Sequence, residues 1–452
     1  MPDWALNIRE KYVSEKPNSS ATPLVAGRDI VVQDELKKYY GVRVAPEHMD
    51  SHDPLFLMYT SGTTGKPKGC QHGTGGYLSY VTAMAKYILD VQPEDVYWCM
   101  ADIGWITGHS FIVYGPLSLG ASSIIYEGVP TYPDAGRSWR IAQDLGVTIF
   151  YTAPTTIRAL RKVGPDEPKK YNFKFKLIGT VGEPIEPEVW RWYYKEIGHD
   201  RAAVVDTYWQ TETGGFVFCT VPGLAPMKPG SAGPGVPGIH PVLFDDDGNM
   251  VPAGANKPAH FCIKNPWPGC FQTIWGDRDR FVKSYFGTYN SNRDSKDWRD
   301  WPYITGDTAI EAADGYVRIL GRADDVINVS GHRLGSKEIE AAALTVPEIA
   351  EAAVVSIPHE IKGSEPELYV SLKPGVTASP DIEKKVADAI VFQIGKIAKC
   401  GKIWIVPDMP KTRSGKIMRR VLLAVSTKGD VGNIMTLANP EIVDEIKKLV
   451  SK

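Results

Sequence analysis

Between residues 120 and 215, short apolar segments alternate with amphipathic ones. The apolar segments are SSIIY (122–126), TIFYT (148–152), LIGTV (177–181) and AVVDT (203–207). The segments between them, 137–146, 155–164 and 187–198, each end in Gly, and two of them begin with Thr or Pro, as helices prefer. A repeated strand–helix pattern is typical of a parallel sheet. We therefore expect an α/β fold whose large domain contains a βα-repeat sheet.

Polar segments follow three of these predicted strands. They are TAPTT (152–156), GEP (182–184) and YWQTETGG (208–215). In open parallel sheets, ligands bind beyond the carboxyl ends of the strands. The three loops are therefore predicted to line one crevice.

The segment YTSGTTGKPKG (59–69) is dense in glycine, hydroxyl and lysine side chains. Glycines let backbone N–H groups turn toward an anion, and the hydroxyls and ammonium groups add further donors. It is not the loop of P-loop NTPases, because Pro67 follows Lys66 and no Ser or Thr begins a helix there. The segment is therefore either a polyphosphate site of another kind or a solvated turn between a strand and a helix.

Two further segments carry candidate chemistry. In 303–340, Asp307 can accept hydrogen bonds from both ribose hydroxyls, and Arg322 and Arg333 offer planar donors to ribose or phosphate. In PKTRSGKIMRR (410–420), Lys416 lies in a Gly/Ser loop. Taken singly, these residues are also compatible with surface salt bridges and a solvated basic turn.

The pattern changes twice along the chain. Residues 216–320 combine Gly/Pro-rich turns with short extended runs, which predicts a small β subdomain. From 324 onward, helical and extended patterns alternate in a compact α+β domain of about 130 residues. We predict an N-terminal domain over 1–323, with 1–50 atypical, and a C-terminal domain over 324–452.

The composition is that of an ordinary globular protein. Of its 452 residues, 51 are Lys or Arg and 53 are Asp or Glu, so the net charge of −2 gives no indication of nucleic acid or an anionic membrane as partner. The six cysteines form no CxxC pair and are predicted to be reduced thiols. No run approaches the roughly 18 apolar residues of a membrane span, and a cytoplasmic location is expected.

Five ordered motifs carry a family resemblance. They are YTSGTTGKPKG, DTYWQTETGG (206–215), TGD (305–307), GRADDVINVSGHRLG (321–335) and PKTRSGK (410–416). From about residue 51 onward the chain resembles the adenylate-forming acyl-CoA synthetase superfamily. Segments 102–117, 126–130 and 151–160 resemble its AMP-forming acetyl-CoA synthetases. The resemblance implies activation of acetate by ATP to acetyl-AMP with release of pyrophosphate, followed by thioester formation with CoA. It also implies a C-terminal domain that moves about a hinge at Asp324.

The resemblance assigns nucleotide roles to three groups of residues. The ATP phosphates would contact Thr60, Ser61, Gly62, Thr63, Thr64, Gly65, Lys66 and Lys68. The adenine and the rest of the nucleotide would lie against Gly182, Glu183, Pro184, Asp206, Thr207, Tyr208, Trp209, Gln210 and Thr211. The ribose would be held by Asp307 and Arg322 and the phosphate by Arg333. The catalytic residues would be Thr211 at the α-phosphate, Glu212 as the Mg²⁺ ligand and Lys416 opposite the developing negative charge.

The resemblance also implies an acyl pocket and a CoA site. The acyl pocket would be formed by Ile106, Thr107, Val181 and Trp209, and CoA would contact Thr107, Thr131, Ser330 and Gly331. A Trp in the pocket removes space for long chains, unless Trp209 is an ordinary core aromatic. One methylene changes discrimination by only about 1–3 kcal/mol, so propionate or another short acid is the alternative substrate.

Several departures concern the CoA-binding part. Only 58 residues precede Tyr59, fewer than in the family. Val391 replaces an arginine, with Lys396, Lys399 and Lys402 nearby, and Thr131 replaces a frequent Asn. The chain is then part of a split enzyme with an N-terminal partner polypeptide, an incomplete gene sequence, or a shortened protein that retains adenylation. A homo-oligomer and a noncatalytic subunit are further alternatives.

Lys416 has a second implied role. It resembles the lysine that protein acetyltransferases modify in this family, and acetylation would remove its charge. An acetyltransferase and a deacetylase acting on Lys416 are therefore expected partners.

Overall fold

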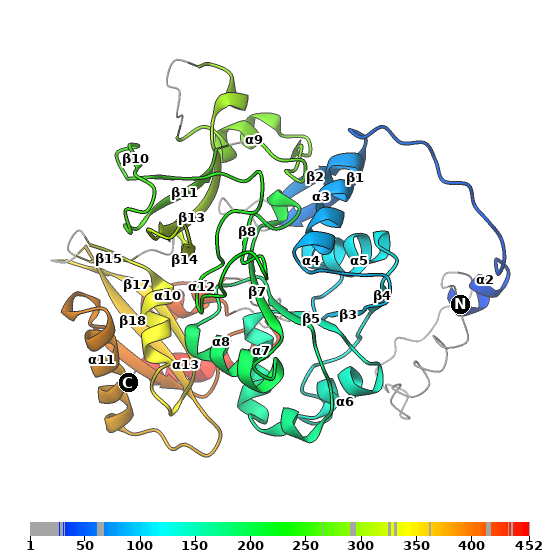
Figure 1. The fold of residues 1–452 in the computed structure, drawn as a ribbon. Helices are drawn as coiled ribbons and strands as arrows, with labels where there is room; N and C mark the ends of the chain where they lie inside the picture. Colours follow the sequence, from blue (N-terminus) through cyan, green and yellow to red (C-terminus); the bar gives the residue numbers. More distant parts are fainter. Residues whose placement is uncertain are drawn as a thin grey trace. The chain divides into compact units, whose positions relative to one another are not determined.

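A computed structural model describes most of the chain. The described residues are 27, 30, 32–60, 67–264, 266–289, 295–323, 327–329, 332–360, 363–412, 417–432, 434 and 437–451. The chain forms two units, Met1–Met49 and Asp50–Lys452. In the described part of the first unit lies helix α2 (Val32–Lys37). All other elements belong to the second unit (Figure 1).

The predicted βα repeat forms a six-stranded sheet in the order β4-β3-β5-β6-β7-β8. Its strands are β3 (Val96–Cys99), β4 (Ser122–Ile124), β5 (Ile149–Thr152), β6 (Leu177–Thr180), β7 (Ala203–Tyr208) and β8 (Phe218–Cys219). The first five pair in parallel, and β8 runs antiparallel to β7. Every residue of β5 and β6 is buried, as in sheets covered on both faces.

The predicted helices connect these strands. They are α6 (Arg137–Asp144), α7 (Pro154–Val163) and α8 (Pro187–Trp192). α7 and α8 each begin with Pro, whose fixed φ suits the first helical turn and whose missing N–H costs no helical hydrogen bond. The α/β prediction for this region is confirmed.

The segment 59–69 joins two antiparallel strands. β1 (Pro54–Thr60) pairs with β2 (Lys68–Gly73), with Thr60 opposite Lys68, and β12 (Thr273–Ile274) extends the sheet. The alternative of a turn between a strand and a helix is therefore wrong, because the chain returns as a strand. Helix α3 (Thr74–Tyr87) follows β2 directly.

The predicted β subdomain is a five-stranded antiparallel sheet in the order β10-β9-β11-β13-β14. Its strands are β9 (Pro241–Phe244), β10 (Met250–Val251), β11 (Ala259–Ile263), β13 (Tyr303–Glu311) and β14 (Val317–Arg322). Helix α9 (Arg278–Tyr285) precedes β13 in the chain and packs against it. The sheet holds Asp307 opposite Arg322.

The C-terminal part is an α+β assembly, as predicted. Its sheet contains β15 (Ile327–Val329), β16 (His332–Leu334), β17 (Ile349–His359) and β18 (Gly363–Leu372) in antiparallel order, with β19 (Lys402–Val406) parallel to β18. Its helices are α10 (Ser336–Ala343), α11 (Pro380–Gln393), α12 (Arg419–Ser426) and α13 (Ile442–Val450). Strands β15 and β16 and helices α12 and α13 are additions to the sequence prediction.

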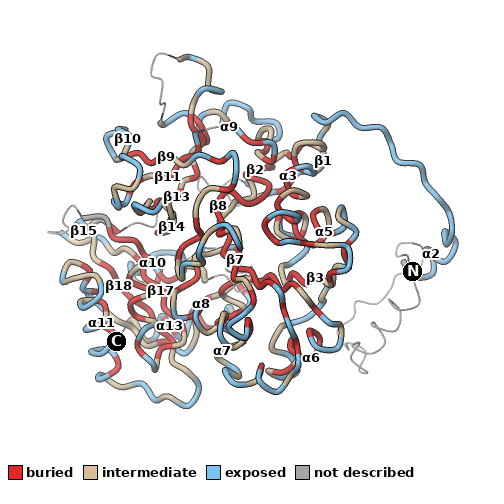
Figure 2. Tube along the Cα trace, viewed as in Figure 1, coloured by how far each residue is buried: buried red, intermediate tan, exposed pale blue. Residues whose placement is uncertain are grey.

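Buried apolar side chains fall into separate clusters on the two sides of residue 324. The largest draws on residues 70 to 319, and two others draw on residues 327 to 446. Buried residues lie in the central strands and in the helices and loops that pack on them (Figure 2). The boundary at 323/324 stays a prediction, because 324–326 lie outside the described residues. Within the described ranges, no helix is both long and apolar enough to cross a bilayer.

Candidate active site

Asp307 is the centre of a buried polar cluster between β7 and β13. The Tyr208 hydroxyl donates to Asp307 Oδ2 at 2.5 Å, and Gln210 Nε2 donates to the same oxygen at 2.9 Å. Arg322 Nη1 lies 3.7 Å from the other oxygen, Oδ1, and its side chain is 43% exposed. The Tyr303 hydroxyl fixes the Gln210 amide by donating to its Oε1 at 2.9 Å. Three residues predicted to hold a nucleoside therefore do lie together around Asp307.

Glu212 and Lys68 form a second cluster, joined by Tyr285 of α9. Lys68 Nζ donates to the Tyr285 hydroxyl at 2.5 Å, and that hydroxyl donates to Glu212 Oε1 at 2.6 Å. Lys68 Nζ is 3.7 Å from Glu212 Oε1. Burial, followed by the Glu212 charge, raises the pKa of Tyr285, which keeps the phenol protonated. Sequence reasoning missed Tyr285.

A buried histidine supports the turn that carries Thr211 and Glu212. His72 Nε2 donates to the Thr211 carbonyl oxygen at 2.8 Å, and the imidazole packs against Phe56 and Tyr77 with ring centroids 5.1 Å away. Burial lowers the pKa of His72 to about 4. The ring is therefore neutral near pH 7, and Nε2 carries the proton that the carbonyl needs. Sequence reasoning missed this residue as well.

The end of β7 is fixed by hydroxyl groups. Thr180 Oγ1 donates to Asp206 Oδ1 at 2.6 Å, and Thr207 Oγ1 donates to the Thr180 carbonyl at 2.7 Å. Burial raises the pKa of Asp206 to about 6, and the hydrogen bonds from Thr180 and Thr207 oppose that rise. Asp206 is therefore a buried residue that helps to fix the end of β7 through its hydrogen bond with Thr180.

The GEP loop after β6 is held by a buried arginine of α7. Gly182 has φ +95°, a conformation that favours glycine. Arg158 Nη2 lies 2.6 Å from Glu183 Oε1, and its Nη1 lies 3.0 Å from Glu186 Oε2. Burial would raise the pKa of Glu183, but the charges of Arg158 and Lys337 outweigh it and lower the pKa to about 2. Glu183 is therefore ionised near pH 7, and its carboxylate pairs with Arg158 and Lys337.

Lys337 continues this network into the C-terminal assembly. Its Nζ lies 3.7 Å from Glu183 Oε2 and 3.0 Å from Glu340 Oε2. Glu340, only 1% exposed, accepts two hydrogen bonds from Arg419 Nη2, at 2.7 Å to Oε1 and 2.8 Å to Oε2. Arg419 begins α12, three residues after Lys416. The loop predicted to border adenine is thus linked by charges to the helix that follows the predicted catalytic loop.

Two of the residues predicted for the acyl pocket, Ile106 and Val181, belong to apolar clusters that Trp209 contacts. Trp209 packs against the apolar cluster that contains Ile106 and against the cluster that contains Val181. Its ring meets Phe111 edge-on, with centroids 5.2 Å apart. Among the described residues, none accepts a hydrogen bond from its buried Nε1. Thr107 and Thr131 are half-buried.

Several predicted residues lie outside the described part of the chain. They are Ser61, Gly62, Thr63, Thr64, Gly65, Lys66, Asp324, Ser330, Gly331 and Lys416. Arg333 is placed in β16, but its side chain is not described. The described flanks of the 61–66 segment, Thr60 and Lys68, are opposite one another in β1 and β2.

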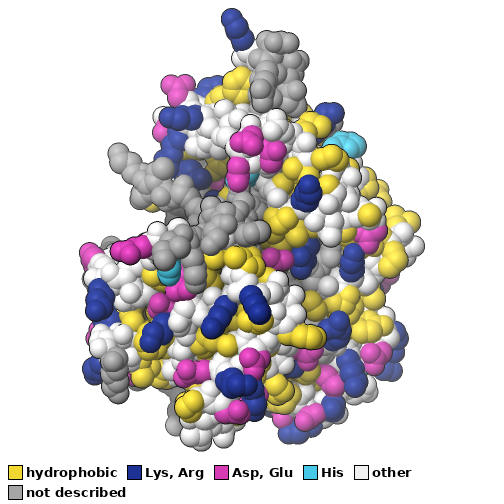
Figure 3. Space-filling model, turned by 90° about the vertical axis from the view of Figure 1, so that its left-hand side faces the viewer, with side chains coloured by type: hydrophobic (Ala, Val, Ile, Leu, Met, Phe, Trp, Pro, Cys, Tyr) yellow, Lys and Arg dark blue, Asp and Glu magenta, His cyan; other side chains and the backbone are white. Residues whose placement is uncertain are grey.

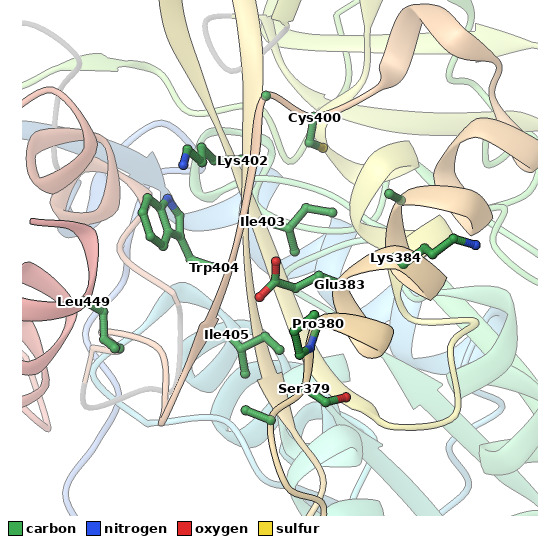
Figure 4. A pocket seen from close by; sticks show the side chains of 13 residues that line it. Ser379, Pro380, Glu383, Lys384, Cys400, Lys402, Ile403, Trp404, Ile405 and Leu449 are labelled. Atoms are coloured by element: carbon green, nitrogen blue, oxygen red, sulfur yellow. The ribbon is translucent and has the colours of Figure 1, made fainter. Parts of the chain in front are cut away.

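A cavity of about 620 Å³ lies in the C-terminal assembly, and its lining includes none of the residues of these clusters. Figure 4 shows Lys402 and Trp404 of β19 on one side and Glu383 and Lys384 of α11 on the other. Of the three lysines near Val391 in the sequence, Lys402 lines this cavity. Its ammonium lies 5.4 Å from the Trp404 ring centroid, a cation–π distance.

On one face of the molecule, positive and negative side chains are mixed, in agreement with the nearly equal numbers of basic and acidic residues in the sequence. Figure 3 shows basic and acidic side chains interspersed on the side formed by the C-terminal assembly and the five-stranded sheet. Charged side chains of these parts also pair locally, as Arg318 of β14 and Glu338 of α10 do at 2.8 Å.

Comparison with known proteins agrees with this geometry. The AMP-binding enzyme family matches residues 6–275, and the AMP-binding enzyme C-terminal domain matches residues 338–416. An anthranilate CoA ligase crystallised with anthranoyl-AMP superposes with a TM-score of 0.74, covering 84% of this chain and 69% of the ligase, at 24% sequence identity. The chain therefore has the fold of adenylate-forming enzymes.

Curated relatives are similar over most of the chain. Acetyl-coenzyme A synthetase of Wolinella succinogenes is 47% identical over 97% of this chain and 67% of its own length. That of Halorhodospira halophila is 49% identical over 89% of this chain and 61% of its own length. That of Sinorhizobium medicae is 48% identical over 89% of this chain, which spans 60% of the relative. With its matched family domains and these relatives, the chain belongs to the family of AMP-binding enzymes.

Proposed function

We propose that the chain carries the catalytic part of an AMP-forming acetate–CoA ligase. The observation that carries the proposal is the 47% identity to an acetyl-coenzyme A synthetase along 97% of this chain. In this reaction acetate attacks the α-phosphorus of ATP, and the bond to pyrophosphate breaks. The CoA thiol then attacks the acetyl carbonyl, giving acetyl-CoA and AMP.

The cluster around Asp307 supports binding of the nucleoside. A carboxylate is an acceptor for vicinal ribose hydroxyls, and Tyr208 and Gln210 hold Asp307 Oδ2 in place. Arg322, partly exposed beside Oδ1, offers a planar donor to the ribose. The 61–66 segment between β1 and β2 would contact the β- and γ-phosphates, and Lys416 would stabilise charge during attack.

The residues present also fit a Mg²⁺ ion bound together with ATP. Among the described residues, no cluster of three or more His, Cys, Asp or Glu side chains could hold a metal alone. Mg²⁺ is commonly held by one or two carboxylates plus substrate phosphates and water. Glu212 has Oε1 tied to Tyr285, and no described residue donates a hydrogen bond to Oε2. When bound, the ion would neutralise phosphate charge.

The acyl pocket and the second half-reaction complete the proposal. Trp209, packed between the clusters of Ile106 and Val181, supports a pocket for a small acid. CoA would enter beside Thr107, Thr131, Ser330 and Gly331 after the C-terminal domain turns about Asp324. Acetylation of Lys416 would block adenylation by removing its charge.

The decisive experiment is acetate-dependent exchange of pyrophosphate into ATP by the 452-residue chain. We expect exchange with the wild-type chain and its loss in Lys416→Ala, which keeps the rest of the nucleotide site. Adding CoA should then release AMP. If propionate supports exchange and acetate does not, the substrate is propionate. No exchange with any short acid, in a chain that still unfolds cooperatively, would refute it.

A further inference from the structure

Tyr285 lies between two charged groups of the site described above. It comes from α9, 217 residues away from Lys68 in sequence and 73 from Glu212. The two charged side chains are 3.7 Å apart, and the phenol hydroxyl contacts both at 2.5 and 2.6 Å. The ammonium nitrogen and the carboxylate are therefore bridged by one hydroxyl.

The chemistry of the three groups fixes the direction of both hydrogen bonds. An ammonium group can only donate, and an ionised carboxylate can only accept. The phenol oxygen must therefore accept from Lys68, and the phenol proton must point at Glu212 Oε1. This arrangement orients the carboxylate and leaves Oε2 without a donor among the described residues.

The aromatic surroundings hold the phenol in this place. The Tyr285 ring stacks on Tyr303 with an interplanar angle of 8° and centroids 5.7 Å apart. Phe271 and Phe281 contact it at centroid distances of 5.0 and 6.2 Å. The ring is 5% exposed. The hydroxyl therefore has little freedom to leave its two partners, and a Phe at this position would keep the same packing.

We propose that Tyr285 is a positioning residue for the metal–nucleotide site. Its hydroxyl holds Glu212 Oε1 and Lys68 apart, so that Glu212 Oε2 is presented to Mg²⁺ and the Lys68 ammonium to phosphate. Without the hydroxyl, the two charges can close into a direct ion pair, which turns both away from the ligand. This inference rests on the proposed function, because it assigns Tyr285 a part in holding the magnesium–ATP complex.

The test is equilibrium binding of Mn²⁺ in the presence of a non-hydrolysable ATP analogue, followed by electron paramagnetic resonance. Mn²⁺ substitutes for Mg²⁺ at oxygen ligands and is directly observable. We expect Tyr285→Phe to weaken Mn²⁺ binding about 10-fold, since hydrogen bonds to charged groups are the stronger class. In the Glu212→Gln background the same change should cause no further weakening, because the two residues act as a unit. The midpoint of thermal unfolding without ligand should stay unchanged.

Tyr80→Phe is the matched control. Tyr80 is also a buried tyrosine, 7% exposed, but its hydroxyl donates to the Phe216 carbonyl at 2.6 Å. Loss of this hydroxyl should leave Mn²⁺ binding unchanged. Equal Mn²⁺ binding by wild type and Tyr285→Phe, or an additive loss in the double variant, would overturn the role of Tyr285 alone. No Mn²⁺ or nucleotide binding by the folded wild-type chain would overturn the proposed function itself.

Discussion

At the scale of a single residue, His72 shows how a fully buried side chain fixes a turn of the candidate site. It is fully buried, and its protonated Nε2 ties β2 to the Thr211 carbonyl, so a positive charge on the ring has no solvent to stabilise it. The turn that carries Thr211 and Glu212 therefore depends on a neutral imidazole.

This environment predicts a pH dependence of stability. The pKa of His72 falls from 6.5 to about 4 in the folded chain. Below pH 6.5 the unfolded chain binds a proton at His72 that the folded chain does not bind. The stabilisation that neutral His72 gives the folded chain is therefore fully present above pH 6.5 and is lost as the pH falls toward 4. The difference between the two pKa values corresponds to about 3 kcal/mol of unfolding free energy. Urea unfolding at pH 7.5, 6, 5 and 4 measures it.

His72→Gln is the control, because the amide can still donate to the Thr211 carbonyl and does not titrate in this range. Its unfolding free energy should be lower than that of wild type at pH 7.5, where glutamine fits the aromatic surroundings less well. The difference between the two chains should then shrink toward pH 4. A constant difference across this range would show that His72 does not titrate as argued.

At the scale of elements, Glu340 joins three parts of the C-terminal assembly. It lies on α10, receives Arg419 from the start of α12, and accepts the Val354 N–H of β17 at 3.1 Å. Burial alone would raise its pKa, but the charges of Arg419 and Lys337 outweigh that effect and lower it. The ionised carboxylate is therefore the form of Glu340 that joins α10, α12 and β17.

Removing this charge should destabilise the assembly strongly. Glu340→Gln keeps the shape but leaves the cationic groups around it without their buried counter-charge, which typically costs about 3–5 kcal/mol. Glu338→Gln on the same helix is the control, since its pair with Arg318 is half exposed and should contribute under about 1 kcal/mol. Urea unfolding of the two variants compares them directly. Equal losses would contradict the buried-charge argument.

The elements also show which parts of the structure the sequence could predict. The buried strands β5 and β6 and the helices between them have local patterns of apolar residues that indicate their type. β15 and β16 have three residues each, too few for an alternating pattern to appear. Motifs located Asp307 and Glu212, but Tyr285 reaches Lys68 across 217 residues, and no local pattern carries such a contact.

At the scale of the whole molecule, the two proposed half-reactions do not have equal support. The clusters around Asp307 and Glu212, which we assign to the nucleotide, are largely buried and are bridged by several hydrogen bonds. The residues expected near CoA are sparser, because Val391 of α11 stands where the resemblance leads us to expect an arginine. Lys396, Lys399 and Lys402 nearby are all exposed. Contacts of exposed lysines with a phosphate are weak and sensitive to salt.

This asymmetry predicts poor recognition of the CoA 3′-phosphate. CoA and 3′-dephospho-CoA should support AMP release with kcat/KM values within about 5-fold of each other, since an exposed ion pair contributes at most about 1 kcal/mol. Val391→Arg should widen the difference in favour of CoA at low salt. Phe392→Arg adds the same charge one residue along α11, where the side chain is 91% exposed, and should have the smaller effect. A wild-type preference for CoA well above 10-fold would mean that other cations of the chain already hold this phosphate.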